Sequence, residues 1–76
     1  MPSNPITSLH NYLQGRHEAH LLSFEESSTG PSNKAVWTVI CKVKGEQKGV
    51  GTGSTIAEAK HIACTQALAA LKAAEQ

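Results

Sequence analysis

The chain contains no aspartate, and it has one tryptophan, one tyrosine and one phenylalanine among its 76 residues. Candidate nucleophiles such as Ser54, Thr55 and Cys64 therefore lack an aspartate partner, and no histidine and glutamate stand at a readable spacing from them. The closely spaced glycines before Ser54 are not followed by a P-loop lysine, and the βαβ unit of a dinucleotide site is missing around them. We therefore expect a protein that is not an enzyme and uses no cofactor.

Patterns that bind metals or form disulfides are also scarce. Cys41 and Cys64 are too few for a structural zinc site, and a single cysteine pair in a chain without a secretion signal is more often two buried thiols than a disulfide. His17 and His20 have no cysteine or carboxylate partner at ligand spacing, which favours solvated histidines. We expect no metal site.

Long apolar runs and strong charge are absent as well. No run approaches the roughly 18 apolar residues of a membrane helix, and the N-terminal residues lack the pattern of a secretion signal. We expect one domain over residues 1–76, with a core at about 4–73, in the cytosol or nucleus and without a membrane partner. The net charge of +1 is too small to indicate nucleic-acid binding from composition alone.

Two helices are predicted near the ends of the chain. Asn4 and Pro5 are favoured residues at a helix start, and Gly15 is expected to end this first helix. Thr55 and Glu58 form a capping box at the start of a second helix, which we expect over 55–73. A buried seam steps by four residues along this helix, and the small side chains in the seam are expected to let the helix lie close to a sheet; the seam residues are Ala59, Ala63, Ala67 and Leu71.

Three strands are predicted between the helices, at 19–26, 35–43 and 47–51. The middle strand alternates apolar side chains, including Trp37, with more polar ones, as a half-buried antiparallel strand does, and Trp37 is expected in the core. Lys44, Gly45 and Glu46 form a turn, and the third strand is expected at the sheet edge. The sequence therefore predicts an α+β fold of order α-β-β-β-α, with a three-stranded antiparallel sheet and both helices on one face.

Three separated segments resemble, in order, those of the double-stranded RNA-binding domain family. The first is Asn4-Pro5-Ile6-Thr7-Ser8-Leu9-His10-Asn11-Tyr12, in which Asn11 stands where the family usually has glutamate. The second is Gly30-Pro31-Ser32-Asn33, followed by Trp37, in which Asn33 replaces a histidine. The third is Ala59-Lys60-x-x-Ala63-Cys64-x-x-Ala67-Leu68. The resemblance spans about 4–71 and implies binding of double-stranded RNA.

The first helix carries polar side chains at helical spacing opposite its apolar stripe, and these can exchange hydrogen bonds with 2′-hydroxyls in the RNA minor groove. They are Thr7, His10, Asn11 and Gln14. The resemblance implies further RNA contacts from Pro31, Asn33 and Lys34 in the loop and from Thr55 and Lys60 at the second helix. RNA would then be recognised by shape, because a protein reads the A-form duplex by spanning its minor grooves and phosphates.

The start of the second helix departs from the family pattern. Two adjacent lysines are usual there, whereas this chain has Ile56 and Ala57 and retains only Lys60. Because each lysine that neutralises a phosphate contributes to affinity, we expect modest RNA affinity. Lys48 is expected to help Lys60 hold phosphate.

Two other functions remain open. Ile56, expected to be exposed, and the near-neutral charge favour a protein-interaction or homodimerisation domain that uses the third strand and the last helix. A minor alternative is the same fold serving another ligand, including a polyhydroxylated one.

Overall fold

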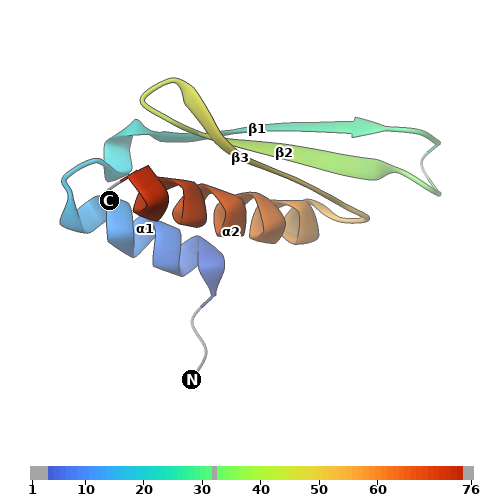
Figure 1. The fold of residues 1–76 in the computed structure, drawn as a ribbon. Helices are drawn as coiled ribbons and strands as arrows, with labels where there is room; N and C mark the ends of the chain where they lie inside the picture. The colour runs from blue at the N-terminus through green and yellow to red at the C-terminus, as the bar shows by residue number, and fades with distance from the viewer. Residues whose placement is uncertain (1–3, 32, 75–76) are drawn as a thin grey trace.

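The structure is a computed structural model that describes residues 4–31 and 33–74 (Figure 1). Its elements are the helix α1 (Pro5–Gly15), the 3-10 turn η1 (Ala19–Leu21), the strands β1 (Leu22–Thr29), β2 (Val36–Val43) and β3 (Glu46–Gly53), and the helix α2 (Ile56–Ala74). The strands form one antiparallel sheet in the order β1-β2-β3. Both helices lie on the same side of it, with α2 against β2 and β3 and α1 against α2. The predicted α+β fold is confirmed.

Helix α1 begins as predicted and ends with a motif that the sequence did not indicate. The Asn4 side chain accepts a hydrogen bond from the Ile6 N–H at 2.8 Å. Gly15 is the last helical residue, but the chain reverses at His17, whose φ is 61°. The N–H groups of His17 and Glu18 bond back to the carbonyls of the last turn, at 3.0 and 2.8 Å, as in a Schellman motif.

Strand β1 starts and ends three residues later than predicted. Residues 19–21 form a 3-10 turn instead, closed by a hydrogen bond of 2.9 Å from the Leu21 N–H to the Glu18 carbonyl. Residues 27–29 were expected in the loop, but they pair with 36–38 of β2 and extend the ladder. The tip of the β1–β2 hairpin therefore reaches well beyond the first turn of α2 (Figure 1).

Strand β3 lies at the sheet edge as predicted and is longer than expected. Lys44 and Gly45, with φ of 58° and 78°, form the two-residue turn before it, the left-handed geometry that suits a tight hairpin. Pairing then continues as far as Gly53 opposite Trp37. Lys48 has no partner in β2 and marks a bulge in the ladder.

The close packing of β3 against α2 explains why β3 contains glycine. A Cβ atom on Gly49 would lie 2.3 Å from the Ala63 carbonyl oxygen, and one on Gly51 would lie 2.1 Å from that of Ala59. Ala59, Ala63 and Ala67 are fully buried, as the small-residue seam predicts. Glycine in the strand and alanine in the helix therefore bring the two backbones into contact.

Most of the larger core side chains come from the other elements. The fully buried ones are Leu9 and Leu13 of α1, Val39 and Cys41 of β2 and Cys64 of α2, with Val43 almost fully buried and Trp37 half-buried against them. Cys41 and Cys64 are both buried and free. Burial raises the pKa of the Cys41 thiol to about 12 and also raises that of Cys64, so both remain protonated and serve as small apolar side chains.

Candidate nucleic-acid interface

The outer face of α1 carries the polar side chains predicted for the minor groove. Thr7, His10, Asn11 and Gln14 are all exposed, opposite the buried Leu9 and Leu13. Within the described residues none of these four side chains takes part in a hydrogen bond. Their donors and acceptors are therefore open to solvent or to a ligand.

The β1–β2 loop places a second group of predicted residues at the end of the hairpin, away from the helices (Figure 1). Gly30 has a φ of 91°, and the Lys34 N–H donates to the Pro31 carbonyl at 2.9 Å, which closes a tight turn. Pro31, Asn33 and Lys34 are exposed. Ser32, part of the loop motif, lies outside the described residues.

At the start of α2, Thr55 is exposed but its hydroxyl is already used. Its Oγ1 accepts a hydrogen bond from the Glu58 N–H at 3.1 Å, which confirms the predicted cap. The Glu58 carboxylate accepts from the Ser54 hydroxyl at 3.1 Å. The Thr55 hydroxyl is therefore engaged in the helix cap, and only its remaining hydrogen-bonding capacity is available to a ligand.

The expectation that Ile56 is exposed was wrong. Its side chain is half-buried and packs against the core, because position 56 lies three residues before Ala59 and so falls on the same helix face. Ala57 is exposed. Of the two positions where the family usually has lysine, one supports the fold and one faces solvent.

Lys60, the lysine expected to hold phosphate, is half-buried beside β1. Its Nζ lies 4.5 Å from the centroid of the Phe24 ring, within the range of a cation–π contact. No carboxylate of the described residues pairs with it. Sequence reasoning missed Phe24, because nothing in the pattern sets the position of β1 against α2.

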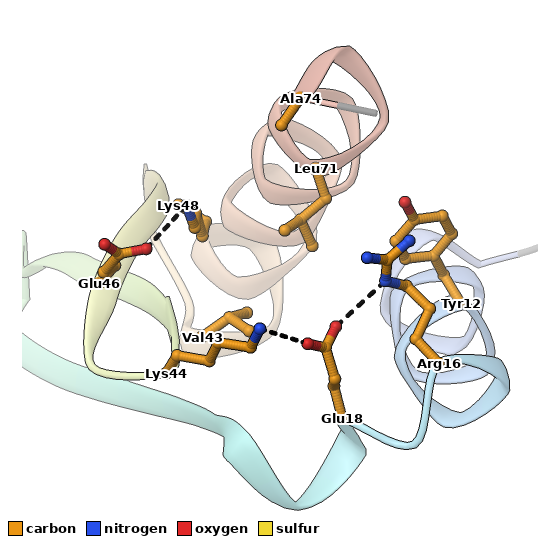
Figure 2. Close-up of a pocket in the computed structure, with 9 residues that line it drawn as sticks. All are labelled: Tyr12, Arg16, Glu18, Val43, Lys44, Glu46, Lys48, Leu71 and Ala74. Carbon is orange, nitrogen blue, oxygen red and sulfur yellow. Dashed lines mark hydrogen bonds and ion pairs between the residues drawn. The ribbon is translucent and has the colours of Figure 1, made fainter. Parts of the chain in front are cut away.

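Lys48 does not join Lys60, although the two were expected to act together. Its Nζ lies 3.1 Å from a Glu46 carboxylate oxygen, near the C-terminal end of α2 (Figure 2). Lys42 is likewise paired with Glu25 at 2.5 Å. Of the candidate lysines, the described structure leaves Lys34 in the loop and Lys60 on α2 without a carboxylate partner.

A pocket of about 170 Å³ lies between α1, the β2–β3 turn and the end of α2 (Figure 2). Glu18 bridges two cations there, with Oε2 at 2.5 Å from Lys44 and Oε1 at 3.1 Å from Arg16. Hydrogen bonds from Lys44 and then Arg16 hold the pKa of Glu18 below its ordinary value. Arg16 also lies over the Tyr12 ring, 5.7 Å from its centroid. These contacts tie α1 to the sheet.

The described residues offer neither a metal site nor a membrane-spanning helix. No group of three or more histidine, cysteine or acidic side chains is placed to hold a metal ion. Among those same residues, neither helix has the length and apolar character needed to cross a membrane.

The fold and the three surface segments agree with a family comparison. The model of the double-stranded RNA binding motif family matches residues 5–71, and the chain belongs to this family, a class of RNA-binding rather than catalytic domains. The chain is also similar to Ribonuclease 3 of Ligilactobacillus salivarius (strain UCC118), with 38% identity over 66 residues. That match covers 87% of this chain but 28% of the relative, so the similarity concerns one part of a longer protein.

Proposed function

We propose that residues 1–76 act as one domain that recognises double-stranded RNA by shape, with modest affinity. One observation carries this proposal. Three separated segments, α1, the β1–β2 loop and the start of α2, present polar or cationic side chains. These side chains are exposed or have no carboxylate partner among the described residues. A duplex is spanned by such separated contacts, because its successive minor grooves and the phosphates between them lie on one side.

The minor-groove contacts would come from α1 and the loop. On α1, Thr7, His10, Asn11 and Gln14 offer hydroxyl, imidazole and amide groups that can donate to and accept from 2′-hydroxyls. In the loop, Pro31 shapes the turn and Asn33 supplies an amide. Lys34 adds a charge beside them that the described residues do not neutralise.

The phosphate contact would come from Lys60, with Thr55 at the helix start beside it. The Lys60 ammonium stands over an aromatic ring rather than a carboxylate, so a phosphate can take the position of a counter-ion without displacing an ion pair. With Ala57 and Ile56 in place of lysines, this single contact supports modest affinity. Two free buried thiols fit a reducing compartment, and duplex RNA in the cytosol or nucleus is the proposed ligand.

A titration that compares three nucleic acids tests this function. A duplex RNA of about 16 base pairs should bind with little dependence on sequence. Duplex DNA of the same sequence should bind much more weakly, because it lacks 2′-hydroxyls, and single-stranded RNA should bind weakly because it lacks the A-form spacing of grooves and phosphates. Equal affinity for the RNA and DNA duplexes would contradict recognition through 2′-hydroxyls.

Self-association through β3 and α2 is less well supported than RNA binding. Ile56, its main support in the sequence, packs against the core. The edge of β3 is also partly covered, because the Val50 N–H donates to the Gln66 side chain of α2 at 3.3 Å. A side chain in this position competes with an incoming strand for the edge N–H group. A sedimentation measurement run beside the RNA titration would detect a dimer if this function were the correct one.

A further inference from the structure

His17 occupies a backbone position that glycine normally fills. It is the residue after the α1 C-cap in a Schellman motif, with a φ of 61°, and a side chain in this left-handed region costs roughly 1 kcal/mol relative to glycine. A glycine is present only two residues earlier, at Gly15, where φ is not positive. Strain retained in this way points to a role for the His17 side chain.

The His17 side chain lines an open groove beside α1. Gln14, His17, Ala19 and His20 form its walls, and both histidines are exposed. Gln14 belongs at once to this groove and to the outer face of α1 that carries Thr7, His10 and Asn11. The groove therefore continues the polar face of the helix past its C-terminal end.

Neither histidine of the groove forms an ion pair with a carboxylate of the described residues. Glu18 lies between them in the sequence, but its carboxylate pairs with Arg16 and Lys44 (Figure 2). Lys44 lies in the turn between β2 and β3, and its backbone N–H donates a hydrogen bond to the Leu21 carbonyl. On the polar face of α1, the titratable side chain is that of His10. Among the described residues no carboxylate lines the groove.

We propose that this groove is a phosphate-binding extension of the α1 surface, in which His17 and His20 hold the RNA backbone next to the minor groove. The inference rests on the proposed binding of duplex RNA. An imidazole N–H donates a hydrogen bond and therefore suits a phosphate oxygen. The groove would supply part of the phosphate contact that Ile56 and Ala57 do not provide.

The test is an anisotropy titration of the whole chain with labelled duplex RNA at one fixed pH and salt concentration. The affinity for the duplex is the readout. We expect the double variant His17→Gly, His20→Gln to lower this affinity by roughly threefold to tenfold, as expected for one or two lost phosphate contacts. His17→Gly alone should leave thermal stability unchanged or raised, because glycine relieves the left-handed strain.

A second variant places a permanent charge in the groove. His20→Arg should bind duplex RNA more tightly than the unaltered chain and steepen the salt slope by about one unit, because the guanidinium stays charged. The proposal is overturned if the double variant keeps the original affinity, or if His61→Gln, at an exposed histidine on α2, lowers the affinity as much. Absence of duplex binding by the unaltered chain would overturn the proposed function as well, whereas duplex binding that the double variant does not change overturns the groove alone.

Discussion

The two ends of α2 use their charged residues in different ways. Near its C-terminal end, Glu18 holds both Arg16 and Lys44. Near its N-terminal end, Lys60 stands over the Phe24 ring and pairs with no carboxylate of the described residues. Charges that are mutually neutralised join elements of the fold, whereas a charge held by an aromatic ring stays available to a phosphate. In this small domain with a net charge of +1, the location of each cation matters more than their number.

The largest effect is expected from a change that separates α2 from the sheet. Such a change would disrupt the charge arrangements at both ends of the helix. In Gly51→Ala the new Cβ would lie 2.1 Å from the Ala59 carbonyl oxygen, where backbone rather than a flexible side chain must move. We expect a loss of about 3 kcal/mol or more in the free energy of unfolding, measured by urea denaturation. Gly15→Ala is the matched control, because nothing lies within 4 Å of its added Cβ. A stable Gly51→Ala would contradict the close contact.

Much of this close packing could be predicted from the sequence. The capping box at Thr55, the small residues every four positions along α2 and the alternation in β2 are local patterns, and local patterns determine local structure. Ile56 could also have been assigned to the core, since it lies three residues before Ala59 on the same seam. The resemblance to the family predicted an exposed side chain there instead, because Ile56 stands where the family usually has a lysine.

Other features depend on contacts between distant segments and could not be predicted. The start of β1 was placed too early because apolar Ala19 and Leu21 flank polar His20, the alternation typical of a strand, whereas the exit from α1 requires a turn there. The end of β1 was placed too early because Ser27, Ser28 and Thr29 favour turns, and the partner strand overrides this preference. The contact of Lys60 with Phe24 requires the relative position of a helix and a strand, which no local pattern contains.

The second largest effect is expected from adding a lysine at the N-terminal end of α2. Ala57→Lys restores one of the two missing family lysines at an exposed position, at a dipole cost of about 0.3–1 kcal/mol. We expect duplex RNA affinity to rise by roughly tenfold at low salt and the salt slope to steepen by about one unit. Ala70→Lys, exposed farther along the same helix, adds the same charge and should have little effect. Equal gains from both variants would show that net charge, and not position, controls binding.

A smaller effect is expected from removing the lysine that is present. Lys60→Ala should weaken RNA binding several-fold and flatten the salt slope by about one unit, as for one phosphate contact. It should also cost about 0.5–1 kcal/mol of stability, because the cation–π contact with Phe24 is lost. Lys72→Ala removes a lysine from the other end of the helix and is the control. If its effect on the slope matched that of Lys60→Ala, the distinction between the two ends would fail.

The smallest effect is expected from neutralising Glu18, and it should appear in stability and not in RNA binding. Folding lowers the pKa of Glu18 from its ordinary value of 4.5, through Lys44 and then Arg16. The stability that this carboxylate contributes is therefore present above pH 4.5 and is lost as the pH falls through the lowered folded value.

Glu18→Gln should reduce the melting temperature slightly at neutral pH, and the difference should vanish below the folded pKa. Glu26→Gln, at an exposed glutamate of β1 without an ion pair among the described residues, is the control and should lower the melting temperature less at neutral pH. If Glu18→Gln instead weakened RNA binding at unchanged stability, the paired charges at this end would belong to the RNA surface, and the contrast between the two ends of α2 would have to be abandoned.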